Sequence, residues 1–195
     1  IVCLQEAMPT SRNVQQIDSL LKPLYAFQDT TMHPGGGNCL MLLSKFPILS
    51  KEIIPYQSKG NMSVAYRLNI RGREVLLVNN HLETTGLSLE ERKQFKRLVV
   101  GKLEVDTAEH TSKLLVVKLA EATRKRASEA EAVASYLKHY GKMSKIVCGD
   151  FNDGPISYAH RTIAKGLTDC FVSSGNGLGI SYHHSGFFVR IDNIL

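Results

Sequence analysis

The 195-residue sequence contains no tryptophan and only four cysteines, Cys3, Cys39, Cys148 and Cys170. The cysteines form no C-x-x-C pair and show no other zinc-ligand spacing, which argues against a structural zinc site. Most of them lie in apolar runs, so we expect buried free thiols, and these favour a reducing compartment such as the cytoplasm. Basic residues do not alternate with aromatic ones, so nothing in the sequence favours stacking on nucleic-acid bases.

The sequence also lacks a long apolar run. The longest stretches, such as Ile1–Leu4 and Val75–Val78, are far shorter than the roughly 20 residues that cross a bilayer. The chain does not begin with the positively charged segment and following apolar segment that are typical of a signal peptide. We therefore expect a soluble domain. Because Ile1–Leu4 resembles the middle of a buried strand, we also expect the natural protein to be longer. Whether a membrane segment lies upstream of residue 1 is left open by the sequence.

The composition is that of an ordinary globular domain, with 43% hydrophobic and 22% charged residues. The length fits one domain over residues 1–195. The net charge of +6 favours a polyanionic partner only weakly, because the basic residues are spread along the chain. We interpret two basic clusters, Lys93/Lys96/Arg97 and Arg124–Arg126, as solvated helix faces.

Hydrophobic periodicity predicts strands near both ends of the chain with helices between them. We expect strands at residues 1–5, 39–43, 63–70, 74–79, 146–148, 179–182 and 187–195. Helices are expected after the N-cap residue Ser11, after the capping box of Ser88 and Glu91, and over about residues 111–139. This order indicates an α/β sandwich rather than a helical bundle or an all-β barrel.

The strongest polar signal follows the predicted strand at residues 146–148 and reads Gly149-Asp150-Phe151-Asn152. In an extended chain, residues two apart point the same way, so Asp150 and Asn152 would face one pocket. A plain turn is the alternative, since Asp, Asn and Gly are the usual turn residues.

Other polar residues follow or interrupt predicted strands in the same manner. His81 comes after the strand at residues 74–79, although a single histidine in such a place is commonly structural. Glu6 follows the first strand, where a surface glutamate is the simpler interpretation. Asp192 interrupts the last apolar strand and would need a partner if it is buried.

Together these segments resemble the endonuclease/exonuclease/phosphatase superfamily. The motifs that carry the resemblance, in chain order, are Leu4-Gln5-Glu6, Leu43-Ser44-Lys45-Phe46-Pro47-Ile48, Asn79-Asn80-His81-Leu82, Gly149-Asp150-Phe151-Asn152 and Arg190-Ile191-Asp192-Asn193-Ile194-Leu195. The resemblance covers essentially the whole chain. It implies a four-layer α/β sandwich, in which two mixed β-sheets pack face to face between helices.

The resemblance also implies a role for each polar residue in hydrolysing a phosphoester. Glu6 would bind Mg²⁺, with Mn²⁺ as the alternative ion, because a hard carboxylate suits a hard cation. Asp150 would position or deprotonate the attacking water, and Asn152 would hold the nucleophile or a phosphoryl oxygen. His81 would donate to a non-bridging phosphate oxygen. Asp192 would orient a second histidine from a later Ser-Asp-His motif.

The family's first-strand asparagine and its Ser-Asp-His motif have no counterpart within residues 1–195. We therefore expect a catalytic domain that is incomplete at both ends, and predict that residues 1–195 alone have little or no activity. The stretch Thr84–Lys125 is extra length relative to short family members. It is expected either to form a wall over the substrate or to be a longer outer helix layer.

The sequence does not distinguish between DNA, a phospholipid and a small phosphoester as the substrate. The segment His81-Leu82-Glu83-Thr84 is faintly similar to the tyrosyl-DNA phosphodiesterase branch of the family. Gly35–Gly37 and Gly175–Gly179 lack the context of a phosphate-binding loop, and Tyr182-His183-His184 is interpreted as a solvent-facing turn. A catalytically inactive phosphate- or nucleic-acid-binding module with the same fold is the competing function. We expect a monomer without a protein partner.

Overall fold

A computed structural model describes residues 1–100, 105–184 and 188–195. The strands are β1 (Val2–Leu4), β2 (Phe27–Met32), β3 (Cys39–Ser44), β4 (Ile48–Ile53), β5 (Met62–Ile70), β6 (Arg73–His81), β7 (Ser144–Asp150) and β8 (Asp192–Ile194). The helices are α1 (Arg12–Leu21), the 3₁₀ helix η1 (Lys22–Leu24), α2 (Leu89–Val99), α3 (Val105–His139), α4 (Tyr158–Ile163) and α5 (Cys170–Ser174). No helix in these ranges is long and apolar enough to span a membrane.

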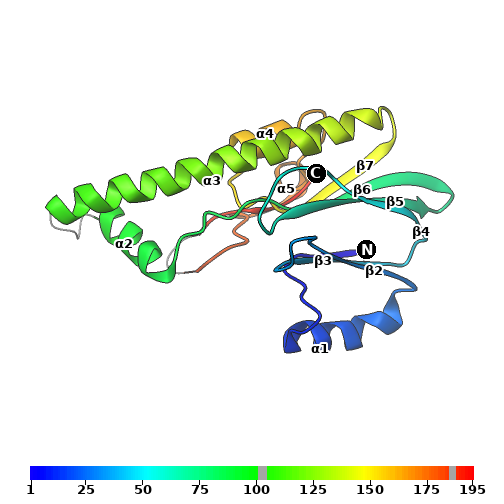
Figure 1. Ribbon diagram of the computed structural model, residues 1–195. Coiled ribbons are helices and arrows are strands. Elements are labelled where there is room, and N and C mark those ends of the chain that lie inside the picture. Colours follow the sequence, from blue (N-terminus) through cyan, green and yellow to red (C-terminus); the bar gives the residue numbers. More distant parts are fainter. Residues whose placement is uncertain (101–104, 185–187) are drawn as a thin grey trace.

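Two sheets lie face to face between helices (Figure 1), which confirms the predicted four-layer sandwich. The smaller sheet has the order β1-β3-β2 and is entirely antiparallel. The larger sheet has the order β4-β5-β6-β7-β8, in which β6 and β7 are parallel and the other neighbours antiparallel. Only the larger sheet is therefore mixed, in contrast to the expectation of two mixed sheets.

Alternation along β3 creates two of the layer interfaces. Leu40 and Leu42 belong to the core between the two sheets, where they join residues of β5 such as Tyr66. Met41 and Leu43 lie in a separate cluster with residues of β1 and α1. Because successive side chains of a strand point to opposite faces, a strand that is buried on both faces is mainly apolar, as β3 is from Cys39 to Leu43.

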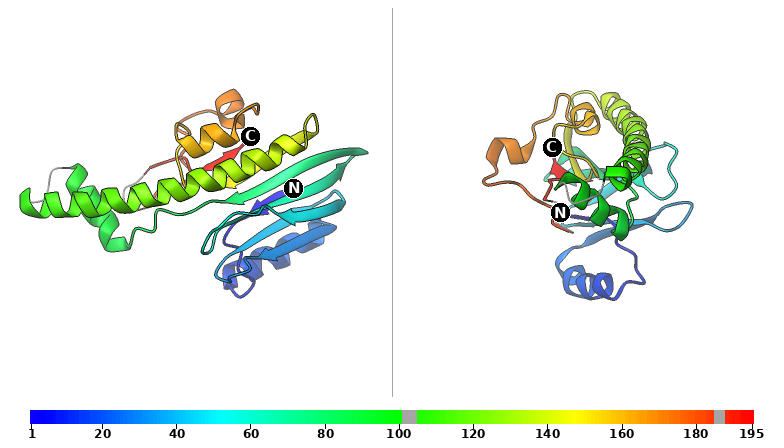
Figure 2. Two further views of the ribbon diagram at one scale, coloured as in Figure 1. Left: turned by 45° about the horizontal axis from the view of Figure 1, so that its top comes forward. Right: turned by 90° about the vertical axis from the view of Figure 1, so that its left-hand side faces the viewer.

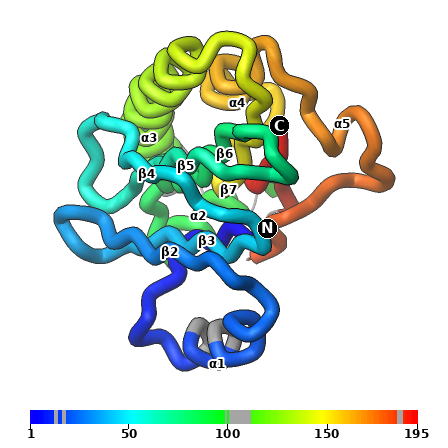
Figure 3. Tube along the Cα trace, turned by 90° about the vertical axis from the view of Figure 1, so that its right-hand side faces the viewer, coloured from blue at the N-terminus to red at the C-terminus, as the bar shows by residue number. Residues whose placement is uncertain are grey.

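Helices α3 and α4 cover the outer face of the larger sheet (Figures 2 and 3). Leu76, Val78 and Val147 of the sheet pack in one cluster with Ala130 and Val133 of α3. Beyond the sheet, α3 continues as a long projection that carries α2 beside it (Figure 1). This projection is the extra length expected at 84–125, of which residues 101–104 lie outside the described part. The expected helix at 111–139 begins earlier, at Val105.

Some expectations about the C-terminal third are wrong. Residues 179–182 form no strand, because Gly179 has a φ of 66° and, within the described residues, the segment makes a single isolated β-bridge, between Tyr182 and Val189. The expected strand at 187–195 is reduced to β8, and Phe187 lies outside the described residues. Cys170 is exposed rather than buried, since it begins the short surface helix α5. Each cysteine is a free thiol, as expected.

Candidate active site

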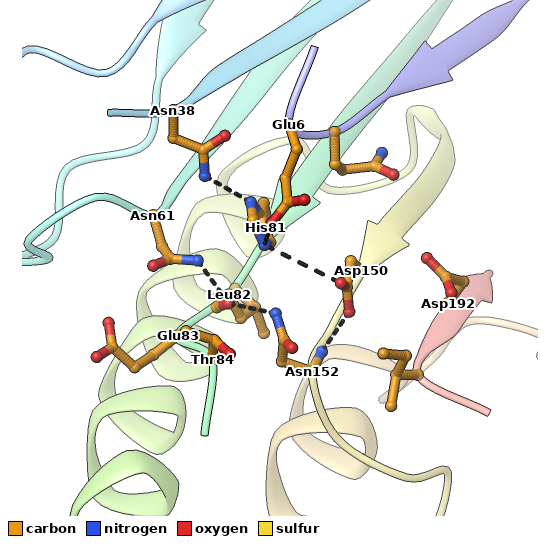
Figure 4. A network of polar contacts seen from close by, with 12 residues as sticks. Glu6, Asn38, Asn61, His81, Leu82, Glu83, Thr84, Asp150, Asn152 and Asp192 are labelled. Atoms are coloured by element: carbon orange, nitrogen blue, oxygen red, sulfur yellow. Dashed lines mark hydrogen bonds and ion pairs between the residues drawn. The ribbon is translucent and has the colours of Figure 1, made fainter. Parts of the chain in front are cut away.

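The predicted polar residues converge at one end of the sandwich (Figure 4). The parallel pairing of β6 and β7 places His81 beside Asp150, and the antiparallel pairing of β7 and β8 places Asp150 beside Asp192. Glu6 approaches from the smaller sheet. The Nε2 atom of His81 lies 3.9 Å from Oε1 of Glu6 and 4.0 Å from Oδ2 of Asp150. Residues that are far apart in the sequence therefore form one site.

Gly149 permits the close approach of β6 and β7 immediately before the site. Its φ is 127°, and a Cβ atom there would lie 2.0 Å from the carbonyl oxygen of Asn80. No side chain fits at that separation. The register of these two strands, and with it the placement of His81 against Asp150, depends on glycine at this position.

The imidazole of His81 is held in one tautomer by Asn38. The backbone N–H of Cys39 donates to Oδ1 of Asn38 at 2.7 Å, so the amide nitrogen of Asn38 is the group that lies 2.6 Å from Nδ1 of His81. That nitrogen can only donate, so Nδ1 accepts and the ring proton resides on Nε2, which faces Glu6 and Asp150. Burial lowers the pKa of His81, although the charges of Glu6 and Asp192 oppose this effect. The site thus contains a neutral imidazole that presents an N–H group.

Glu6 and Asn152 both adopt left-handed backbone conformations, with φ of 54° and 49°. This conformation is uncommon for residues other than glycine and is found preferentially at functional sites. The side chain of Glu6 is 79% exposed and points toward His81 (Figure 4). It is a surface glutamate, as the simpler interpretation held, but one directed into the site.

Asn152 lies in a turn, because β7 ends at Asp150. The extended-chain reasoning for its direction is therefore wrong. Its backbone N–H donates to Oδ1 of Asp150 at 2.7 Å, and its side-chain amide donates to the carbonyl oxygen of Leu82 at 2.9 Å. Asn61 donates to the same carbonyl at 2.7 Å. The amides thereby tie the turn after β7 to the segment after β6.

Burial raises the pKa of Asp150 to about 7. The charges of Asp192 and Glu6 raise it further, whereas the N–H of Asn152 and the charge of Arg126 oppose the shift. Carboxylates close to one another repel, so the ionised form of this group is disfavoured in the absence of a cation. A carboxyl whose pKa lies near neutrality can accept a proton at physiological pH.

Sequence reasoning missed a buried brace that α3 supplies to the segments after β6 and β7. Arg126 is 3% exposed and donates to Oδ2 of Asp153 at 3.1 Å and to the carbonyl oxygen of Glu83 at 3.0 Å. Glu129 is fully buried, and its Oε2 accepts from the N–H of Glu83 at 2.7 Å. The interpretation of Arg124–Arg126 as a solvated face is therefore wrong for Arg126. Its spacing of four residues from Ala122 and from Ala130, both buried, is the signal that places it on the inward face.

The carboxylates of the site suit a hard divalent cation, although they do not form a closed cage. Within the described residues, no group of three or more His, Cys, Asp and Glu side chains is arranged to hold a metal ion. Mg²⁺ commonly binds through one or two carboxylates and takes its other ligands from water and substrate phosphate. Glu6, exposed and facing Asp150 across His81, fits that requirement.

The sequence profile of the Endonuclease/Exonuclease/phosphatase family matches residues 1–195. The chain belongs to this family. The family is named for enzymes that cleave phosphoesters, and its match over the whole chain supports phosphoester hydrolysis as the general activity. A search of curated protein sequences finds no match.

Solved structures with the endonuclease/exonuclease/phosphatase fold resemble the chain at low sequence identity. The catalytic domain of human nocturnin, determined with a sulfate anion, has a TM-score of 0.60 and 16% identity; the match covers 98% of this chain and 67% of nocturnin. Truncated TDP2 from Caenorhabditis elegans has a TM-score of 0.65 and 16% identity, with coverage of 98% and 68%. Sphingomyelinase C from Streptomyces griseocarneus has a TM-score of 0.61 and 15% identity, with coverage of 99% and 69%. At these identities the likeness establishes the fold.

Proposed function

We propose that this protein hydrolyses a phosphoester in a Mg²⁺-dependent reaction, with Mn²⁺ as the alternative ion. The observation that carries the proposal is the neutral His81, whose Nε2–H faces Glu6 and Asp150 at 3.9 and 4.0 Å. A hydrogen-bond donor beside carboxylates that suit a cation is an arrangement that can receive an anionic phosphate.

Glu6 is proposed as the protein ligand of the cation. When bound, the cation would supply neutralisation of negative charge on the phosphate oxygens. His81 donates from Nε2 to a non-bridging oxygen of the phosphate, where negative charge grows in the transition state. The single ring proton of the neutral imidazole stays on Nε2, because Nδ1 accepts a hydrogen bond from Asn38.

Asp150 is proposed to orient the attacking water and accept its proton. Burial raises its pKa, and a bound cation would oppose that shift, so the carboxylate would be ionised and able to accept a proton. Asn152 uses one side-chain N–H for Leu82, which leaves its second N–H to hold the nucleophile or a phosphoryl oxygen. Asp192 lies beside Asp150 in the sheet, where it is positioned to orient an imidazole or, through its charge, to maintain the basicity of Asp150.

The proposal is tested by hydrolysis of a panel that includes abasic DNA, a phospholipid and a small phosphomonoester, with Mg²⁺ or with EDTA. The decisive variant is Glu6→Gln, since its exposed side chain can be changed without disturbing the core. Glu74→Gln is the matched control on β6, where the glutamate side chain is 48% exposed and remote from the site. Asp150→Asn tests the general base in the same assay.

We expect turnover that requires Mg²⁺, is lost in Glu6→Gln and Asp150→Asn, and is unchanged in Glu74→Gln. Residues 1–195 are assayed in parallel with the protein as it is naturally expressed, here called full-length, because little or no activity is predicted for residues 1–195 alone. Absence of turnover on every substrate by folded full-length protein would reject the enzyme and favour the phosphate- or nucleic-acid-binding module.

A further inference from the structure

A pocket of about 430 Å³ extends from the turn after β7 to the α2–α3 projection. Asn152 lies at the end nearest the proposed catalytic residues. The apolar residues of its wall come from the projection and from the segment before β8, and they are Leu87, Phe95, Leu119, Val189 and Ile191. The extra length at 84–125 therefore borders the site, as the expected wall would.

The cationic side chains that line this pocket are already engaged. Arg126 donates to Asp153 and to the carbonyl oxygen of Glu83. Arg92 donates to the carbonyl oxygen of Leu87 at 3.1 Å and to the hydroxyl of Tyr182. Asp153 neutralises the charge of Arg126, whereas the contacts described for Arg92 are to neutral acceptors. The pocket therefore offers at most one uncompensated cation, which is too few for a polyphosphorylated ligand.

Polar contacts hold the wall of the pocket in place. Lys118 of α3 donates to Glu91 of α2 at 2.5 Å. Arg92 also lies 5.9 Å from the centre of the Tyr182 ring, so α2 is linked to the segment before β8 as well. Tyr182 is consequently a half-buried wall residue, in contrast to the solvent-facing turn expected for residues 182–184. These contacts fix the positions of α2 and Tyr182 on the wall of the cavity.

We infer that this pocket binds an uncharged, apolar substituent of the phosphoester substrate, either an aromatic ring or an alkyl chain. This inference rests on the proposed function, since the phosphate at His81 would place the substituent next to Asn152. The volume lies in the range of small-molecule sites, which are mainly apolar with a few polar groups at one end. The pocket would thus favour apolar esters over polar or multiply charged ones.

The experiment measures binding, so it does not depend on turnover. Methyl-, hexyl- and phenylphosphonate are titrated calorimetrically into the full-length protein with Mg²⁺. The phosphonate group occupies the phosphate site, and only the substituent differs. Val189→Asp places a carboxylate on the pocket wall at a position that is 40% exposed. The matched control is Val116→Asp on α3, which is 62% exposed and does not line the pocket.

We expect hexyl- or phenylphosphonate to bind at least about tenfold more tightly than methylphosphonate. Burial of only about two methylene groups is enough for that ratio, and hexyl exceeds methyl by five. Preference for phenyl identifies a ring, and preference for hexyl identifies a chain. The ratio of the affinity for hexyl- or phenylphosphonate to the affinity for methylphosphonate should fall toward one in Val189→Asp and stay unchanged in Val116→Asp. An unchanged affinity of Val189→Asp for methylphosphonate shows that this variant is folded.

Two results would overturn the inference, and they differ in what else they reject. If every phosphonate binds the wild-type protein equally, the pocket does not select apolar groups, although the proposed phosphate site stands. If none binds in the presence of Mg²⁺, the phosphate site itself is wrong and the proposed function fails with the inference.

Discussion

Glu129 offers a stability test of the brace between α3 and the loop after β6. Its carboxyl is fully buried and accepts from the N–H of Glu83. Burial raises its pKa from 4.5 to about 7, an effect that the charge of Glu83 adds to and that the hydrogen bond from Glu83 and the charge of Arg126 reduce. The substitution Glu129→Gln keeps the shape and the acceptor oxygen but removes the titration.

The sign of the effect follows from proton binding in the two states. Below about pH 4.5, Glu129 is protonated in both the folded and the unfolded chain, so its ionisation does not lower the free energy of unfolding. Between about pH 4.5 and 7, the folded state retains a proton that the unfolded state has lost, and the free energy of unfolding therefore falls as the pH rises. The difference between the two pKa values corresponds to a decrease in the free energy of unfolding on the order of 3 kcal/mol, and this decrease is complete above pH 7.

The assay is equilibrium unfolding by urea of wild type and Glu129→Gln between pH 5 and pH 8. Other titrating groups, such as Asp150, cancel in the difference between the two proteins. The stability of Glu129→Gln relative to wild type should rise by a few kcal/mol over this range. Glu121→Gln, on the same helix and 66% exposed, is the control and should show no such rise. Parallel pH curves for wild type and Glu129→Gln would refute the reasoning.

The remaining predictions concern the geometry of the site. Gly149→Ala should destabilise the fold by more than about 3 kcal/mol in urea unfolding, because its Cβ would overlap the carbonyl of Asn80; a stable variant would show that β6 and β7 can separate. Arg126→Met should lower the free energy of unfolding by about 3 kcal/mol, because Asp153 loses its cationic partner. Arg126→Lys should restore only part of that stability, since an ammonium group cannot bond Asp153 and the carbonyl of Glu83 in the geometry of a guanidinium. Asn38→Asp should raise the pKa of His81 in an NMR titration, because it places a carboxylate beside Nδ1, and an unchanged pKa would contradict the contact between residue 38 and the ring.

The sequence was sufficient to predict the elements in which burial leaves a clear pattern. The apolar runs that became β3 and β6 are buried on both faces, and β7 alternates between buried and half-buried residues along its apolar part. By contrast, β2 and β4 are mostly exposed, so they carry polar residues and lack the alternation that marks a half-buried strand. Helices α4 and α5 have 6 and 5 residues, too few for a periodic signal.

The site shows the same division between local and long-range information. Glu6, His81, Asp150 and Asp192 were predicted from the family resemblance of the motifs that contain them, since the position of each after or within an apolar strand left a plain structural role open. The structure brings them together. Asn38 was not predictable, since its contact with His81 spans 43 residues and no local pattern marks it. The left-handed backbone of Asn152, which redirects its amide to Leu82, was likewise not visible in the spacing of the motif.

Arg126 connects the two functional inferences. The same guanidinium lines the pocket beneath the projection and bonds both the loop after β6 and the turn after β7. The first segment follows His81 directly, and the second contains Asn152. A ligand group that displaced Arg126 would therefore disturb the catalytic loops, whereas an apolar group that packs beside it leaves its hydrogen bonds intact. The requirement to keep this buried cation paired is a physical reason, independent of pocket shape, for the site to select an apolar substituent.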